Sequence, residues 1–245
     1  MLNLSQSARF DELSVAVPDF IRYPTIRKLA ERVQHETLNA AASSVLYDPY
    51  NTSRSARVLD SLYQTPIADA SILVAITHER YPKLLLTRRA AHMNSHAGEV
   101  SCAGGKYETS DGNNVVTALR EACEETALPP NKVQLLGQLP IQTSKSGMSV
   151  RPIVALIAPD LVLVPELGEI SRIFWADFET LLTQPTVEYS IEYMMQDQTA
   201  TILTPSWQVD GETVWGLTGR VIASLLETGF DRQLEWYYRI QESRL

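Results

Sequence analysis

Cysteine is scarce in this chain, and long apolar runs are absent. The two cysteines, Cys102 and Cys123, are too few for a disulfide framework, so we interpret them as packing residues in a reducing compartment. No stretch approaches the roughly 20 apolar residues of a membrane-spanning helix. Residues 1–13 lack the basic start and apolar run of a signal peptide. We therefore expect a cytoplasmic protein without a membrane partner.

Basic residues are outnumbered by acidic ones. The chain has 21 Lys and Arg against 29 Asp and Glu, a formal net charge of -8. A nucleic-acid backbone requires a basic surface, so we expect no nucleic-acid partner. A small phosphorylated substrate remains compatible, because metal ions and local cations can form a positive pocket on an acidic protein. The candidate cations are Arg88, Arg89, Lys106 and Arg151.

The length of 245 residues and the 44% hydrophobic content are sufficient for a sizeable core. We expect one domain at residues 70–245, ending in helices, after a partly helical extension at residues 1–69. Apolar residues at helical spacing predict a helix at residues 25–41, and residues 48–55 are typical of a loop.

Short apolar segments predict several strands in the domain. Residues 71–77 and 83–87 predict a hairpin, and residues 150–157 predict a strand in which Pro152 indicates an edge or a bulge. Residues 161–182 favour a strand, a turn and a short helix. Residues 214–240 favour two helices broken near Thr228 and Gly229.

The stretch richest in chemical groups is residues 104–128, where a glycine turn precedes a short acidic helix. In a helix at residues 115–126, Glu121, Glu124 and Glu125 lie at positions i, i+3 and i+4 of one face and repel one another unless a cation lies between them. Mg²⁺ or Mn²⁺ suits such oxygen ligands. Arg120 precedes Glu124 by four residues and can pair with it. The alternative is a solvated acidic helix face.

This stretch resembles the signature of the Nudix hydrolases: a glycine, five residues, an acid, seven residues, then Arg-Glu-U-x-Glu-Glu-x-Gly-U, where U is aliphatic. Gly105 and Asp111 have the family spacing. Eight residues separate Asp111 from Arg120, and Ala127 replaces the usual glycine. The resemblance implies an α/β fold, specifically an α/β/α sandwich with a mixed sheet, and hydrolysis of a pyrophosphate bond with Mg²⁺ or Mn²⁺ as cofactor.

A wider resemblance, over residues 84–154, is to the coenzyme A pyrophosphatase branch of that family. The branch signature is similar to LLTxRSxxLRxHxGxVxFPGG, and this chain has LLTRRAAHMNSHAGEVSCAGG in the same register. Departures fall at Ala90, Met93, Asn94, Cys102 and Ala103. From the matching segments, the substrate-binding candidates are Arg89, His96, Gly104, Gly105 and Arg151. His96 has a structural hydrogen bond as its alternative role, and Arg89 can pair with a helix carboxylate instead of a phosphate.

The mechanism implied by the family follows from charge. A pyrophosphate resists attack because its oxygens are already negative, so a catalyst must neutralise them and present a deprotonated water. We expect metal ions held by Glu121, Glu124 and Glu125, with Asp111 as a further ligand through water. The candidate catalytic residues are these three glutamates and Arg120. A helix glutamate is the expected general base, with Glu166 and Glu169 as later alternatives.

The favoured function is hydrolysis of coenzyme A or its thioesters to 3',5'-ADP and a phosphopantetheine product. One alternative is a Nudix hydrolase of another nucleoside diphosphate derivative, such as ADP-ribose, NADH or a dinucleotide. A second is an inert binding or regulatory protein with the same fold. A homodimer is compatible with the family. Residues 243–245 are similar to the SKL peroxisomal address, which matters only in a eukaryote.

Overall fold

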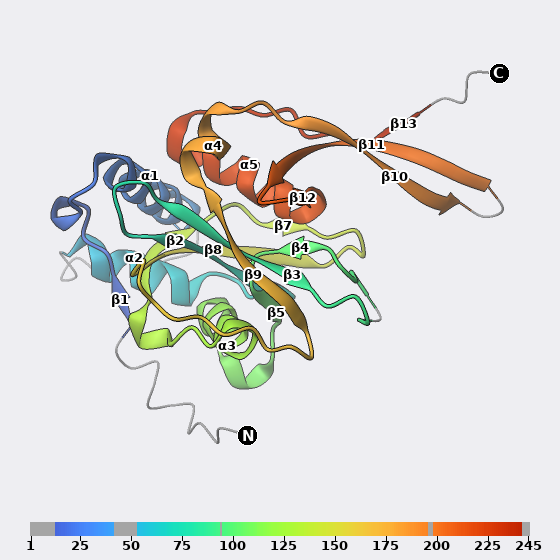
Figure 1. Cartoon of the computed structure of the whole chain (residues 1–245). Helices are drawn as coiled ribbons and strands as arrows, with labels where there is room; N and C mark the ends of the chain where they lie inside the picture. The colour runs from blue at the N-terminus through green and yellow to red at the C-terminus, as the bar shows by residue number, and fades with distance from the viewer. Residues whose placement is uncertain (1–12, 42–52, 94, 196–197, 242–245) are drawn as a thin grey trace.

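The structure is a computed structural model that describes residues 13–41, 53–93, 95–195 and 198–241 (Figure 1). Most of the loop predicted at residues 48–55 lies outside these ranges, and so does the possible targeting signal at residues 243–245. Within the described ranges, no helix is both long enough and apolar enough to cross a membrane.

One mixed sheet of nine strands lies at the centre of the described part of the molecule. The strands are Ser14–Val15 (β1), Ala70–Thr77 (β2), Lys83–Arg89 (β3), Val100–Ser101 (β4), Gly104–Lys106 (β5), Gln134–Gln138 (β6), Gln142–Thr143 (β7), Ser149–Ile157 (β8) and Ile170–Asp177 (β9). The main path has the order β1-β6-β8-β2-β3-β4, while β5, β7 and β9 pair with β2, β8 and β3 respectively. β8 runs parallel to β2, whereas β3 is antiparallel to β2, as predicted for a hairpin. The predicted α/β class with a mixed sheet is confirmed.

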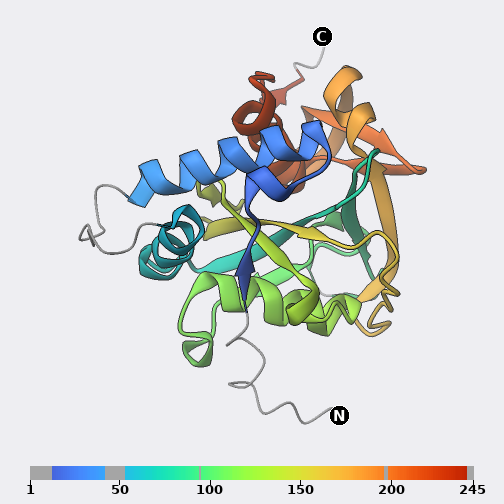
Figure 2. The same cartoon turned by 90° about the vertical axis from the view of Figure 1, so that its left-hand side faces the viewer.

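Helices cover both faces of this sheet. They are Pro24–Ala41 (α1), Arg54–Gln64 (α2), Asn114–Thr126 (α3), Phe178–Thr183 (α4) and Gly216–Phe230 (α5). On β2, Val74 and Ile76 pack in the core on the α1 and α5 side, and Leu73 and Ala75 pack on the α3 side, because successive strand side chains point to opposite faces. Figure 2 shows α1 and α5 over one face and α3 beneath the other, so the predicted α/β/α sandwich is confirmed.

The two N-terminal helices differ in how well the sequence predicts them. The helix predicted at residues 25–41 is present as α1, whose Ile26, Leu29 and Val33 are buried. The sequence gives no prediction for α2, which begins at Arg54 inside the expected loop. Its apolar signal is short, since Val58 and Leu62 are its buried apolar residues.

Pro152 lies neither on an edge strand nor at a bulge in the pairing of β8 with β2, so that prediction is wrong. β8 lies inside the sheet between β6 and β2, and Pro152 faces Ile72 of β2 in the parallel pairing. On its other side, the partner of β8 changes at this point, because β6 ends opposite Ile153 and β7 begins opposite Val150. The missing N–H of proline therefore falls where one neighbouring strand replaces another.

The strand predicted at the start of residues 161–182 is also absent, because the strand in that region is β9 and begins at Ile170. The backbone N–H groups of Val164 and Glu166 instead donate to the carbonyls of Thr126 and Glu125, each at 2.9 Å. These carbonyls belong to the last turn of α3 and have no partner within the helix. The segment therefore supplies hydrogen-bond donors for the carbonyls at the end of α3. The short helix predicted after the strand is present as α4.

The C-terminal region has one helix where the sequence predicts two. α5 continues through Thr228 and Gly229 to Phe230, and a Cβ at Gly229 would lie 2.5 Å from Leu29 Cδ1. Gly229 therefore permits close packing of α5 on α1 rather than a break. The chain then runs without helix or strand to Arg239–Ile240 (β13), which pairs with β11.

A second sheet, which the sequence patterns do not predict, lies beside α5. Its strands are Val187–Met195 (β10), Gln198–Val209 (β11), Glu212–Val214 (β12) and β13. Figure 1 shows β10 and β11 as a two-stranded ribbon that projects from the rest of the molecule. β10 and β11 are consecutive along the chain and pair with each other, whereas β13 follows α5 and pairs with β11.

Candidate active site

Both ends of α3 are fixed by local hydrogen bonds. At the first turn, Asn113 Oδ1 accepts from the N–H groups of Val115 and Val116, both at 3.0 Å, as expected for an asparagine N-cap. At the last turn, Ala127 has a left-handed φ of 56° and its N–H donates to the Cys123 carbonyl at 2.9 Å. This is the conformation that glycine usually adopts after a helix. The helix therefore ends where predicted although alanine replaces glycine.

Arg120 holds the acidic edge of α3 together. Its Nη1 donates to Glu121 Oε1 at 2.9 Å and to Glu124 Oε2 at 3.0 Å, and its Nη2 donates to the Lys106 carbonyl at 3.0 Å. Its Nε donates to Asp111 Oδ1 at 2.8 Å. The hydrogen bond to Asp111 does most to raise the pKa of Arg120, so the guanidinium stays charged although its side chain is only 9% exposed.

Asp111 is an anchor for Arg120 in this structure. Besides the contact with Nε, it accepts from Arg120 Nη2 at 3.1 Å, from Thr117 Oγ1 at 2.9 Å and from the Glu108 N–H at 3.0 Å. Burial opposes its ionisation, but the hydrogen bonds from Arg120, Glu108 and Thr117 outweigh burial and lower the pKa of Asp111. Both carboxylate oxygens are thus engaged inside the protein, on the side of Arg120 away from Glu124.

Glu125 is the most buried of the three helix glutamates, with 3% of the residue exposed. Its Oε2 accepts from the Gly104 N–H at 3.2 Å, and its Oε1 lies 3.6 Å from Arg89 Nη1. Burial raises the pKa of Glu125 to about 7, against the opposing effects of the Gly104 N–H and the Arg89 charge. The negative charges of Glu121 and Glu169 raise it further.

Glu121 occupies space that only a glycine at position 105 leaves open. A Cβ at Gly105 would lie 2.5 Å from Glu121 Cδ and 2.6 Å from its Oε1. Burial raises the pKa of Glu121, Arg120 opposes that shift, and Glu124 and Glu169 add to it. Glu124 is the most exposed of the three helix glutamates, with a side chain that is 56% exposed.

The site therefore has an excess of negative charge. Five carboxylates gather near two arginines; they are Asp111, Glu121, Glu124, Glu125 and Glu169, with Arg89 and Arg120. Among the side chains that the structure describes, no three of His, Cys, Asp or Glu are already arranged as a metal site. Asp111, Glu121 and Glu124 pair with Arg120 instead, and Glu125 lies beside Arg89.

The donor set nevertheless fits a divalent cation of the Mg²⁺ type. Every candidate ligand is a carboxylate oxygen, as a hard cation requires. The pKa of Glu121 and that of Glu125 are both raised, so each carboxylate would gain from a nearby positive charge. Glycine at position 105 keeps the approach to Glu121 free of a side chain. The residues that would hold the ion are Glu121, Glu124 and Glu125.

The five substrate-binding candidates do not all lie at this cluster. Gly104 and Gly105 line it from β5, and Arg89 enters it from the end of β3, where its Nε is buried without a hydrogen-bond partner among the described residues. Arg151 is 4% exposed and donates to Gln138 Oε1 at 2.8 Å and to the Pro66 carbonyl at 2.7 Å. It is therefore an internal connector in this structure, and a substrate has no access to it.

His96 lies at the surface. Its side chain is 61% exposed, its φ is 54°, and its Nδ1 lies 2.8 Å from Glu99 Oε2. Its contact within the protein is therefore with Glu99, and no hydrogen bond links it to the acids of α3 in the described residues. The neighbouring His92 contacts the Gly168 carbonyl through Nε2 at 3.0 Å and so joins the segment after β3 to the segment before β9.

Glu166 and Glu169, the two alternative bases named from the sequence, differ in position in a way that the sequence pattern does not predict. Glu169 joins the cluster because its segment follows the end of α3, and the Ala90 N–H donates to the Glu169 carbonyl at 2.7 Å. Glu166 uses its backbone N–H to bond the Glu125 carbonyl. Nothing in the spacing of residues 161–169 distinguishes these two acids, because their positions depend on long-range contacts with α3 and β3.

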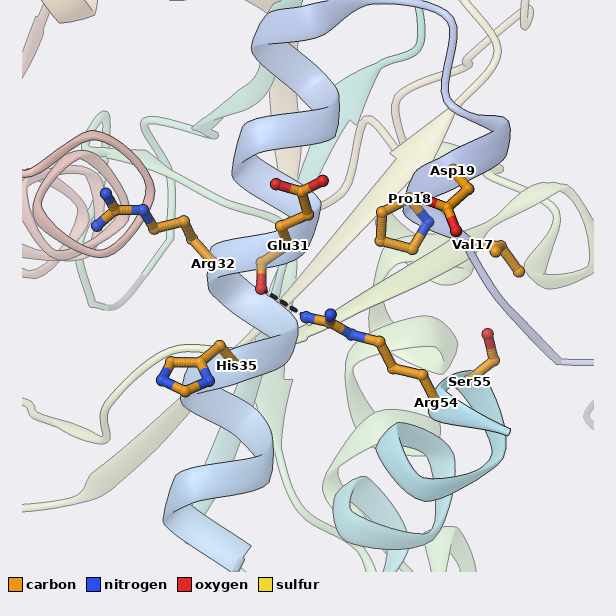
Figure 3. Close-up of a pocket in the computed structure, with 8 residues that line it drawn as sticks. All are labelled: Val17, Pro18, Asp19, Glu31, Arg32, His35, Arg54 and Ser55. Carbon is orange, nitrogen blue, oxygen red and sulfur yellow. Dashed lines mark hydrogen bonds between the residues drawn. The ribbon is translucent and has the colours of Figure 1, made fainter. Parts of the chain in front are cut away.

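A separate hollow of about 510 Å³ lies between α1, α2 and residues 17–19, far along the chain from the acidic cluster (Figure 3). Its basic side chains do not converge on a common point. Arg54 Nη2 donates to the Glu31 carbonyl at 2.8 Å, and Arg32 pairs with Asp231 at 2.5 Å. Asp19 and Glu31 also line it. We therefore place the candidate active site at α3 and not in this hollow.

Comparison with known proteins gives matches to one family. The model of the NUDIX domain family matches residues 67–197. An uncharacterized Nudix hydrolase, NudL, of Pectobacterium atrosepticum is 38% identical over 156 residues, which cover 64% of this chain and 80% of that protein. NudL of Escherichia coli K12, also uncharacterized, is 35% identical with the same coverage. A MutT/nudix family protein from Enterococcus faecalis is 14% identical in its crystal structure, with a TM-score of 0.43, and the match covers 81% of this chain and 74% of that chain.

Proposed function

The chain belongs to the Nudix hydrolase family, whose members act on pyrophosphate bonds, and we propose that its substrate is coenzyme A or a coenzyme A thioester. Water adds to one phosphorus, the P–O–P bridge breaks, and the products are 3',5'-ADP and a phosphopantetheine product. The substrate assignment is supported by the resemblance of residues 84–154 to the coenzyme A branch. The reaction type is supported by the acidic edge of α3.

The observation that carries the proposal is the position of Glu121, Glu124 and Glu125 around the side-chain-free turn at Gly105. These three carboxylates would hold Mg²⁺ or Mn²⁺, which supplies charge neutralisation for the diphosphate and acidifies a bound water. Arg120 orients Glu121 and Glu124, and Asp111 orients Arg120. Asp111 is therefore proposed as a positioning residue and no longer as a metal ligand.

Two groups beside Glu125, the Arg89 guanidinium and the Gly104 N–H, are the proposed partners of a substrate phosphate. Arg89 has a side chain that is 19% exposed, and its Nη1 lies 3.6 Å from Glu125, longer than a hydrogen bond. Its guanidinium is therefore available to donate a hydrogen bond to a phosphate oxygen as a second partner. The Gly104 N–H at the turn already points at an anionic oxygen, that of Glu125. Arg151 and His96 have no part in this proposal.

A panel of diphosphate substrates tests the proposal. Purified protein with Mg²⁺, and separately with Mn²⁺, is offered coenzyme A, acetyl-coenzyme A, ADP-ribose, NADH and a diadenosine polyphosphate, and products are separated by chromatography. We expect 3',5'-ADP to be released from coenzyme A or its thioester faster than any other product forms. Preference for ADP-ribose, NADH or the dinucleotide would contradict the substrate assignment but not the reaction type.

A glutamine variant tests the assignment of the site in the same assay. Glu125→Gln should lower kcat by roughly 1,000-fold, about 4 kcal/mol of transition-state stabilisation, because the ligand charge is removed while the side-chain shape is retained. Glu179→Gln, on the exposed surface of α4, is the matched control and should retain wild-type turnover. Absence of turnover with every substrate and in both variants would favour the inert binding protein.

A further inference from the structure

An exposed aliphatic surface lies on the segment that borders the acidic cluster. Val162, Val164 and Leu167 are 83%, 57% and 70% exposed. Leu161 and Leu163 alternate with them and pack against the core beneath α3. Single exposed apolar residues are ordinary, but three within six positions of one segment make a local patch. We call Val162, Val164 and Leu167 the apolar strip.

Backbone hydrogen bonds hold the apolar strip beside the site. Val164 and Glu166 donate to the carbonyls of Thr126 and Glu125 in the last turn of α3. Leu167 then lies in a tight turn, in which the N–H groups of Glu169 and Ile170 donate to the Glu166 carbonyl at 3.0 and 2.7 Å. The segment connecting β8 to β9 follows α3 in Figure 1. The strip is therefore linked through the backbone to Glu125 and Glu169, two acids of the cluster.

The turn is also fixed from the opposite side. His92 Nε2 contacts the Gly168 carbonyl, and the Ala90 N–H donates to the Glu169 carbonyl. Leu167 is thus presented on a segment that is tied to both α3 and the end of β3. A ligand that covers the exposed Leu167 side chain would not need to order this backbone first, which lowers the entropic penalty of binding.

We propose that the apolar strip binds an alkyl group carried by the substrate, so that a diphosphate substrate with an acyl chain is preferred to one without it. This inference rests on the proposed function, and it identifies the residues that give selectivity among coenzyme A substrates. The strip is entirely aliphatic, and residues 161–169 include no aromatic residue. A nucleobase is commonly held by stacking on aromatic side chains, so an alkyl chain suits this surface better than a base does.

The test is the dependence of kcat/KM on acyl length, measured with free, acetyl-, butyryl- and octanoyl-coenzyme A in Mg²⁺. Each methylene that becomes buried can raise kcat/KM by at most about fourfold. We expect octanoyl-coenzyme A to exceed acetyl-coenzyme A by at least about tenfold with the wild-type protein. In Leu167→Asn and in Val164→Thr, which is close in shape to valine, this ratio should fall several-fold, because the contact surface becomes polar.

Tyr81→Asn is the matched control. Tyr81 is 63% exposed on the turn between β2 and β3, at the opposite end of the sheet from β5, and the variant should keep the wild-type ratio. A chain-length profile that is flat in the wild type, or a ratio unchanged in Leu167→Asn, would overturn the inference while the proposed function stands. Equal losses for all four substrates would indicate contact with the nucleotide instead and also overturn it. If the wild-type protein turns over none of the four, the proposed function itself fails, and the inference fails with it.

Discussion

Burial of Glu125 should make the stability of the metal-free protein depend on pH. The pKa of this carboxyl is raised from 4.5 to about 7, chiefly by burial. An acid whose pKa is higher in the folded state stabilises that state below its unfolded pKa. This contribution is lost as the pH rises through the folded pKa. Glu125 should therefore favour the folded state at low pH and oppose it above about pH 7.

The size of the effect follows from the shift between 4.5 and about 7. At about 1.36 kcal/mol per pKa unit, deprotonation of Glu125 should remove about 3 kcal/mol of folding free energy between pH 4.5 and the alkaline side of pH 7. Glutamine cannot ionise, and its side-chain oxygen can still accept from the Gly104 N–H. The free energy of unfolding of Glu125→Gln should therefore lack this component of the pH dependence.

Urea unfolding in the presence of EDTA, at a series of pH values from 5 to 8.5, measures the effect. The variant should gain stability relative to the wild type as the pH rises, by about 2.5 kcal/mol over this range. Glu179→Gln, at an exposed position on α4, should follow the wild-type curve. If the curves of the wild type and Glu125→Gln run parallel, the result would contradict the raised pKa of a buried carboxyl beside Gly104.

Three further predictions concern the same site. Gly105→Ala should lower kcat by about 100-fold with little loss of stability in urea, because its Cβ would lie 2.5 Å from Glu121 Cδ and displace that carboxylate. Arg120→Lys should lower the free energy of unfolding by about 3 kcal/mol, since lysine cannot reproduce the fork of hydrogen bonds that includes Asp111. Glu169→Gln should reduce kcat at least tenfold more than Glu166→Gln, because Glu169 is the acid close enough to affect Glu121.

The helix that carries the chemistry is predictable because its determinants are local. The apolar positions of α3 and the spacing of Glu121, Glu124 and Glu125 lie within one segment. The helix starts one residue before the predicted position and ends at the predicted one. The pairing of Arg120 with Glu124 is also a contact of adjacent turns. The mixed sheet is implied by the family resemblance, and the order of the apolar segments permits it without determining it.

Features that depend on distant segments are harder to predict. Arg151 is a cation in a matching motif, yet its strand turns the side chain inward to Gln138 and Pro66. Glycine at position 229 is typical of a helix end, but here it accommodates Leu29 of α1. In place of the second predicted C-terminal helix, residues 231–238 form neither helix nor strand, and Trp236 stacks on Trp207 of β11 with ring centroids 5.4 Å apart. In each case tertiary packing overrides the local signal.

The central claim is that the carboxylates of α3 bind a divalent cation. Titration of the metal-free protein with Mn²⁺, followed by the loss of the free-ion signal in electron paramagnetic resonance, measures this directly and requires no substrate. The wild type and Glu179→Gln should bind Mn²⁺ alike, whereas Glu121→Gln and Glu125→Gln should each weaken binding by at least tenfold. Equal Mn²⁺ binding in all four proteins, or none in the wild type, would contradict the account.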